Sequence, residues 1–160
     1  MEQIFLKVDG IKGESTSNQG KDEIEVLSYS HGIAMPVAHS VSGGQRTHGR
    51  AQVQDFTINK HVDATSPVFM KYCADGINIK TMTLRHLRAD TLADKAVPLF
   101  TIDMDNVLVT SVSGGGSDQP MESISFNFSK VTWTYGAQTT DAKAAGVVSH
   151  SYDIALTDVK

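Results

Sequence analysis

The sequence predicts an all-β domain with one inserted helix. About seven or eight segments alternate apolar and polar residues with a period of two, which is typical of strands that bury one face. A single segment, at residues 66–75, has helical spacing instead. The chain has 160 residues, which fits one domain, 1–160, with one core.

The helix expected at residues 66–75 carries signals at both ends. Ser66 is a good N-cap, and Pro67 follows in the first turn, where its missing N–H costs nothing. Gly76 marks the C-terminal stop. A helix of about ten residues is shorter than the ~12 to 15 that hold together alone in water. We therefore expect neighbouring strands to stabilise it.

Strands are predicted on both sides of this helix. Residues 4–8 alternate, and residues 23–33 form a second strand in which Val26, Ser28 and Ser30 share one mostly small face. The strands that enter and leave the helix are marked by apolar pairs, Phe56 with Ile58 and Met82 with Leu84.

The segment at residues 36–50 is expected to form a long extended loop. Its sequence, PVAHSVSGGQRTHGR, is too polar and glycine-rich for the interior of a strand or helix. It is also longer than a typical connection of ~4 to 6 residues. A loop of this length in a compact domain usually makes a contact outside that domain.

The pattern after Pro98 contains a change of phase. One strand face is expected to hold Phe100, Ile102, Met104, Leu108 and Val112. The return strand after the SGGGSDQP turn carries Ile124, Phe126 and Phe128, and then Val131, Trp133 and Tyr135. The second set is out of step by one, which indicates a bulge, a strand that passes between sheets, or a strand covered on both faces.

The rest of the chain is expected to end in an edge strand. Residues 136–147 read as a polar loop, and Tyr152, Ile154 and Leu156 mark the last strand. Together these patterns favour a small barrel or sandwich with an oligomer contact.

Charge and cysteine content exclude several classes of protein. The net charge of −4 comes from 18 acidic and 14 basic residues in mixed order, without the basic stripe that binds a phosphate backbone. The single cysteine, Cys73, excludes an internal disulfide. No apolar run approaches the ~18 residues of a membrane span, and the first residues lack a signal-peptide pattern. We expect synthesis in the cytoplasm, no membrane insertion and no nucleic acid partner.

No residue is nominated as catalytic, cofactor-binding or metal-ligating. The six histidines have no ligand spacing, and Asp103 and Asp105 lack the glycine and glutamate of a calcium loop. Residues 42–50 lack the Gly-Lys-Ser/Thr ending of a phosphate loop, and no Gly-x-Ser-x-Gly elbow occurs. Cys73 is expected to pack against the core. Three readings stay open: a non-enzymatic assembling domain, a β-barrel hydrolase, and a monomeric barrel that binds a ligand inside.

A family resemblance separates these readings. Residues 107–135, VLVTSVSGGGSDQPMESISFNFSKVTWTY, resemble the signature of the Hcp (haemolysin-coregulated protein) family, the tube proteins of bacterial type VI secretion. FLKVDGIKGES, EIEVLSYSHGI and FTINKHVDATSPVFMKYCADG are similar to the family in order and spacing, so the resemblance covers nearly the whole chain.

The resemblance implies a fold and an assembly. The fold would be a small β-barrel of two packed antiparallel sheets with one flanking helix, about residues 66–75. Six copies would form a ring, and rings would stack into a hollow tube that a contractile sheath propels beneath a spike protein. The subunit would be a structural protein, not an enzyme, secreted without a signal peptide and holding small effector proteins in its lumen.

The resemblance also implies positions for contacts. Ser30 corresponds to a lumen-facing position, and Val26 and Ser28 would share its face. The loop at 36–50 would contact the next ring or the sheath, and Val131, Trp133 and Tyr135 would supply part of a subunit interface. The loop residues expected to make the contact, of which several replace a plainer glycine and serine run of the family, are His39, Ser42, Gly43, Gly44, Gln45, Arg46 and His48.

Overall fold

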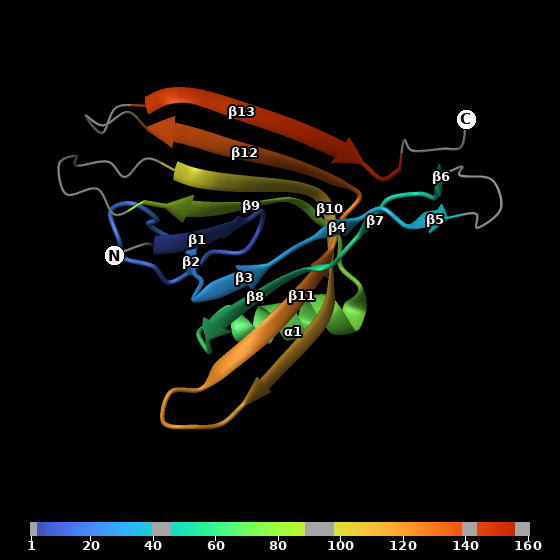
Figure 1. Cartoon of the computed structure of the whole chain (residues 1–160). Helices are drawn as coiled ribbons and strands as arrows, with labels where there is room; N and C mark the ends of the chain where they lie inside the picture. Colours follow the sequence, from blue (N-terminus) through green and yellow to red (C-terminus); the bar gives the residue numbers. More distant parts are fainter. Residues whose placement is uncertain (1–2, 40–45, 89–97, 139–143, 156–160) are drawn as a thin grey trace.

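The computed structural model describes residues 3–39, 46–88, 98–138 and 144–155, which contain thirteen strands and one helix (Figure 1). The elements are β1 (Gln3–Val8), β2 (Ile24–Glu25), β3 (Ser28–Ser30), β4 (Ile33–Ala34), β5 (Val37–His39), β6 (Arg46–His48), β7 (Gln52–Val53), β8 (Phe56–His61), α1 (Ser66–Asp75), β9 (Ile79–Leu87), β10 (Pro98–Gly115), β11 (Met121–Asn127), β12 (Lys130–Gln138) and β13 (Ala144–Asp153).

Two antiparallel sheets enclose the core. The first sheet has the order β2-β1-β9-β10-β12-β13, and the second has the order β10-β11-β8-β3. The long strand β10 belongs to both sheets, because residues 98–107 pair with β9 or β12 and residues 108–115 pair with β11. The predicted fold class, mainly β with two packed antiparallel sheets and one helix, is confirmed.

The passage of β10 between the sheets occurs at Asn106. This residue has φ of 51°, a left-handed conformation that Asn tolerates better than most residues. The backbone turn reverses which side chains point inward: Met104 and Val107 are both about 1% exposed or less, whereas Leu108 is 40% exposed. The prediction that Leu108 continues the inner face of Met104 is therefore wrong.

The predicted strand at residues 23–33 is in fact three short strands, β2, β3 and β4. Between β2 and β3 the backbone leaves the first sheet: the Val26 N–H donates to Ile4 O at 3.0 Å, and the next N–H, of Leu27, donates to Asn59 O on β8 at 2.8 Å. The two sheets are thus joined here and at β10, and they curl around one core.

The change of phase between β11 and β12 also marks a passage between sheets, which was one of the three alternatives. β11 pairs with the second half of β10 and β12 with the first half. Phe128 and Val131, on either side of the passage, are both buried. The expectation of a loop over residues 136–147 is wrong, because β12 continues to Gln138 and β13 begins at Ala144. Within the described chain β13 pairs with β12 alone, so a C-terminal edge strand is present, but it begins earlier than predicted and ends at Asp153, before Ile154. Leu156 lies outside the described residues.

The helix spans residues 66–75, as predicted, but the residue predicted to cap its N-terminus does not do so. Thr65, not Ser66, precedes the first helical residue, and no side chain caps the helix. The Ser66 hydroxyl instead accepts a hydrogen bond from the Asp63 N–H at 3.0 Å and donates one to Glu122 Oε1 at 2.6 Å. Phe69 is fully buried and meets the Phe126 ring edge-on at 5.8 Å. Packing therefore stabilises the short helix, as expected.

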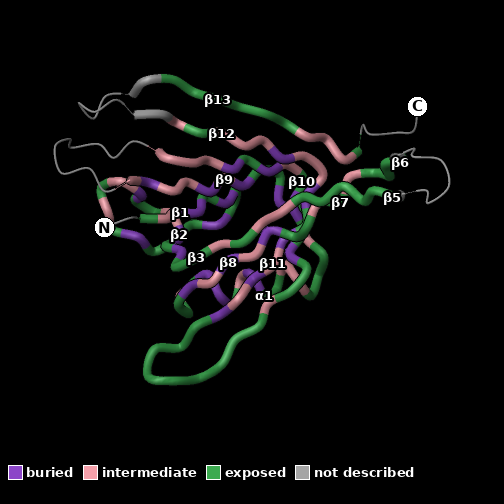
Figure 2. Tube along the Cα trace, in the orientation of Figure 1, coloured by how far each residue is buried: buried purple, intermediate pink, exposed green. Residues whose placement is uncertain are grey.

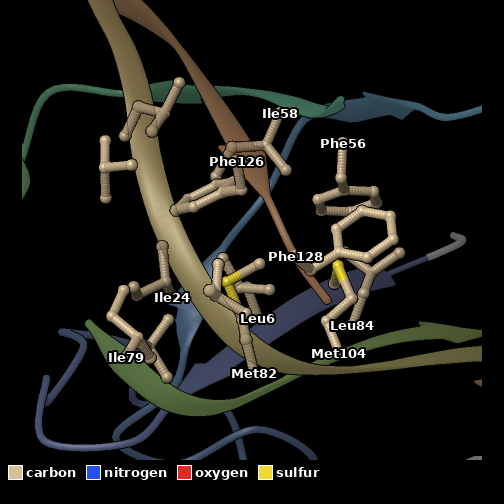
Figure 3. Packing of buried hydrophobic residues seen from close by; sticks show 14 of the residues in the cluster. Leu6, Ile24, Phe56, Ile58, Ile79, Met82, Leu84, Met104, Phe126 and Phe128 are labelled. Carbon is tan, nitrogen blue, oxygen red and sulfur yellow. The ribbon is translucent and has the colours of Figure 1, made fainter. Parts of the chain in front are cut away.

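The core lies between the two sheets (Figure 2). Figure 3 shows side chains from both sheets converging there, with Leu6, Met82, Leu84 and Met104 from the first and Ile58 and Phe126 from the second. Exposure increases toward β13 and toward the tip of the β10–β11 hairpin. The uncovered surfaces are therefore at the margins of the sheets.

The segment at residues 36–50 contains a hairpin where a loop was predicted. β5 and β6 pair with Val37 opposite His48 and Ala38 opposite Thr47, and the pair projects away from the two sheets (Figure 1). The Gly49 N–H donates to Pro36 O at 2.9 Å, and Arg50 Nη2 donates to Ile154 O at 2.7 Å. The first bond closes the stem of the hairpin, and the second joins the stem to the residue that follows β13.

Candidate assembly surfaces

The outer face of the second sheet carries two rows of small uncharged side chains. In one row Ser28, Asn59, Ser123 and Ser113 are cross-strand partners, and in the next row the partners are Ser30, Thr57, Ser125 and Ser111. Because cross-strand partners point to the same side, these residues form one surface. The residues between them, such as Ile58 and Ile124, point into the core.

Hydrogen bonds within these rows hold the polar groups in place. Asn59 Nδ2 donates to Ser28 Oγ at 3.0 Å, and the hydroxyls of Thr57 and Ser125 lie 3.0 Å apart. A wall of small, uncharged groups that already bond to one another offers many weak contacts and no strong one. Such a surface suits loose contact with varied partners.

The predicted lumen residues divide between this face and the core. Ser28 and Ser30 are exposed on it, but Val26 is only 6% exposed and packs in the core. The prediction that Val26 lies on this face is wrong, because the passage between β2 and β3 interrupts the alternation. The other members of the rows were missed, although hydroxyl and amide residues alternate with large apolar ones in both β8 and β11.

A second surface is apolar and lies on β12 and β13. Tyr135 faces Val148 across these strands, Trp133 faces His150, and Val131 faces Tyr152. Exposure rises along this face: Val131 is fully buried, Trp133 is partly buried, and Tyr135 and Val148 are 42% and 60% exposed. Val131 therefore belongs to the core of its own chain and cannot supply a subunit contact, whereas Trp133 and Tyr135 remain available.

An open cleft of about 410 Å³ separates this face from the end of β3. Its walls come from β3, β4, β10 and β12, and they are mostly apolar or aromatic. The residues that line it are Tyr29, Ser30, His31, Gly32, Ile33, Phe100, Ile102 and Trp133.

His31 sits inside this cleft among aromatic rings. Its ring centroid lies 5.6 Å from Phe128, 5.8 Å from Trp133 and 6.2 Å from Phe56. Neither ring nitrogen has a hydrogen-bond partner, which in a buried group costs about 1–3 kcal/mol. Burial lowers the pKa of His31 below its ordinary value of 6.5, and the Gln54 backbone, close to the ring but outside hydrogen-bonding geometry, opposes this only in part.

The hairpin residues are only partly described. His39 and Arg46 face each other across β5 and β6, and His48 is exposed, with Nδ1 3.3 Å from Gly49 O. Ser42, Gly43, Gly44 and Gln45 lie outside the described residues.

The metal-ligating side chains of the described chain do not gather into a metal site. No three His, Cys, Asp or Glu residues there are placed to hold a metal ion. Asp103 lies on an exposed strand face and accepts a hydrogen bond from Thr83 Oγ1 at 2.8 Å. Cys73 is partly buried and packs against the core. The only helix in the part that is described is too short to cross a membrane.

Comparisons with known proteins find relatives over most of the chain. Residues 5–135 match the family model described as "Type VI secretion system effector, Hcp". Protein hcp1 of Pseudomonas aeruginosa is 32% identical over 155 residues, which cover 94% of each chain.

Two solved structures are similar in fold. One, a type VI secretion system effector from Yersinia pestis, is 32% identical, with a TM-score of 0.75 over 94% of this chain and 98% of that one. The other, a type six secretion system protein, is 26% identical, with a TM-score of 0.87 over 97% of both chains.

Proposed function

Because the chain belongs to the Hcp family of type VI secretion proteins, we propose that six copies close into a ring and that rings stack into a hollow tube. The subunit is then a structural protein and not an enzyme. The observation that carries this proposal is that one small domain exposes two unlike surfaces, the uncharged rows of the second sheet and the apolar face of β12–β13. A ring requires a contact surface between copies, which the apolar face can supply, and an inner face toward the central hole, which the uncharged rows can supply.

The second sheet lines the lumen in this proposal. Its rows contain hydroxyls and amides but no charged side chain. A lumen of this kind holds small effector proteins weakly, so that it can carry more than one kind and release them after transport. Ser28 and Ser30, together with Thr57 and Ser125, are the residues assigned to this contact.

The apolar face of β12–β13 is the subunit interface in this proposal. Tyr135 and Val148 are large apolar residues in register on one exposed face, at 42% and 60% exposure. Exposed apolar groups that continue a core outward favour a covering partner. Trp133 connects this face to the cleft and completes the contact.

The β5–β6 hairpin makes contacts outside the ring. It projects from the body of the domain (Figure 1), and its described side chain His48 is exposed. An adjacent ring or the sheath would receive it, and a spike protein would cap the tube. The protein would be made in the cytoplasm and then leave the cell with the tube.

Mass in solution tests this function. A ring of six 17.3 kDa chains has a mass of about 104 kDa, and sedimentation equilibrium measures it without reference to shape. Electron micrographs of the same sample should show rings with a central hole, viewed along the axis. A stable monomer at high concentration would instead favour a β-barrel hydrolase or a monomeric ligand-binding barrel.

A further inference from the structure

His31 combines three features that together call for a partner. Its ring is enclosed by Phe128, Trp133 and Phe56, both of its buried nitrogens lack a hydrogen bond, and it borders an open apolar cleft. Buried polar atoms are nearly always paired in folded proteins, so an unpaired group at an open cleft indicates that something else completes the site.

The position of the cleft indicates what covers it. In the described chain β3 is an edge strand of the second sheet, pairing with β8 alone, and the cleft begins at Tyr29 and Ser30 on this strand. If the second sheet lines the lumen of a ring, its edges lie where one copy meets the next. The far wall of the cleft, Trp133, continues into the exposed apolar face at Tyr135. The cleft therefore lies at the junction between copies.

We propose that the neighbouring copy of this chain covers the His31 cleft when the ring closes, and that closure requires the neutral form of His31. This inference rests on the proposed ring. Acidification then opens the ring, because a charged imidazole among four apolar walls cannot be sealed from water without a counter-ion.

Titratable groups surround the cleft, but none supplies that counter-ion. The lining residues include no Asp, Glu, Lys or Arg. On β3 and β9, Tyr29 OH lies 3.3 Å from His86 Nδ1, and on β13 His150 is opposite Trp133. The other side chains around the His31 imidazole are apolar. They are Phe56 of β8, Phe128 after the end of β11, and Phe100 and Ile102 of β10. No acidic side chain in the cleft lining therefore faces His31 to balance a charge on it.

The direction of the pH effect follows from burial. Burial lowers the pKa of His31 in the single chain, and covering the cleft lowers the pKa further. The separate copies therefore bind more protons than the ring does once the pH falls through the pKa of His31 in the single chain, which lies below the ordinary value of 6.5. Assembly is unaffected well above that pKa and weakens as the pH falls through it. The loss is steep, because each ring must release six protons.

Sedimentation velocity at one protein concentration, at pH 7.5 and pH 5.0, tests the proposal. At pH 7.5 most wild-type chains should sediment as rings, and at pH 5.0 the fraction of chains in rings should be at least threefold lower. Circular dichroism should show folded chains at both pH values. His31→Phe keeps an aromatic ring without a titrating nitrogen and should remain assembled at both values. The control His61→Gln, at an exposed histidine at the end of β8 that does not line the cleft, should behave as the wild type.

A second measurement keeps the proposal testable if His31→Phe does not fold. NMR of wild-type protein with ¹³C-labelled histidine should show a neutral imidazole at position 31 in the ring at every pH at which rings persist. A charged His31 in an intact ring, or wild-type rings that persist unchanged at pH 5.0, would overturn the proposal and leave the ring itself standing. A pH effect removed by His61→Gln would also overturn it. Absence of rings at pH 7.5 would overturn both.

Discussion

Lys60 on β8 and Glu122 on β11 lie opposite each other across the second sheet, and their side chains meet inside the protein, with 2.7 Å between Nζ and Oε1. Both side chains are almost completely buried, at 0% and 2% exposure. Lys60 also donates to Asp63 Oδ1 at 2.9 Å and to His61 O at 2.8 Å. The pair thereby connects two strands to the start of the helix.

Removing one partner of this pair should destabilise the protein strongly. Lys60→Met leaves Glu122 buried without its cation, and a broken buried pair typically costs about 3–5 kcal/mol. Urea unfolding measures the loss. The exposed pair Lys12 and Asp22, with 3.4 Å between Nζ and Oδ1, is the matched control, and Lys12→Met should cost under about 1 kcal/mol. Equal effects of the two variants would contradict this account of the buried pair.

Asp63 predicts how stability depends on acid. Burial by itself would raise the pKa of Asp63, but hydrogen bonds from Thr65 and Lys60 together with the Lys60 charge outweigh it and hold the pKa below the ordinary value of 3.8. A carboxyl whose folded pKa is depressed stabilises the fold above its unfolded pKa, and that contribution is lost as the pH falls through the folded pKa. The stability difference between wild type and Asp63→Asn should thus shrink as the pH is lowered from 5 to below 3. Urea unfolding at several pH values shows this, and a constant difference would argue against it.

Asn106 should be hard to replace because of its backbone. Its φ of 51° costs ordinary residues roughly 1–2 kcal/mol, and its Nδ2 donates to Ser129 Oγ at 3.1 Å. Asn106→Val should both lose this hydrogen bond and strain the left-handed backbone. Asn106→Gly tolerates the conformation and loses only the exposed hydrogen bond, so it should be clearly more stable than Asn106→Val in thermal unfolding. The reverse order would show that the conformation is not strained.

Ser30 tests the assignment of the lumen. Ser30→Gln adds bulk to the uncharged rows, so rings should still form while retention of effectors, measured by co-purification, falls severalfold. Ser125→Gln, in the same row, should act in the same way. Thr81→Gln, exposed on β9 in the first sheet, is the control and should retain effectors normally. If Ser30→Gln and Thr81→Gln retain equal amounts, the second sheet does not line the lumen.

Local patterns in the sequence predicted local structure well, and failed where the chain changes sheets. The helix at Ser66–Asp75 was predictable because Pro67 and Gly76 mark it within ten residues. Val26 and Val131 were misplaced because alternation assigns residues to two faces of one strand, but it does not show where that strand leaves its sheet. The burial of both follows from such a passage.

Other features had no local signal. The sequences of β5 and β6, VAH and RTH, show no apolar alternation, so the local pattern does not predict their pairing. The His31 cleft is assembled from residues 29–33, 100–102 and 133, which only the folded topology brings together. The phase change before Val131 was informative, because it correctly included a passage between sheets among its explanations.

The hairpin can be separated from ring formation by deletion. Its stem is fixed by the Gly49 and Pro36 backbones and by Arg50 Nη2 donating to Ile154 O, whereas residues 38–48 lie beyond these bonds. Replacing 38–48 with a short glycine linker should therefore leave the core and the β12–β13 face intact, and rings should form with unchanged mass per subunit. Tube growth, sheath docking or both should weaken, because the projecting contact is lost. Sedimentation and electron micrographs of tubes measure the two effects separately.

Arg50→Ala is the graded variant, since it frees the stem without shortening the hairpin, and it should weaken stacking less than the deletion does. A deletion variant that sediments only as a monomer would place the hairpin within the ring contact.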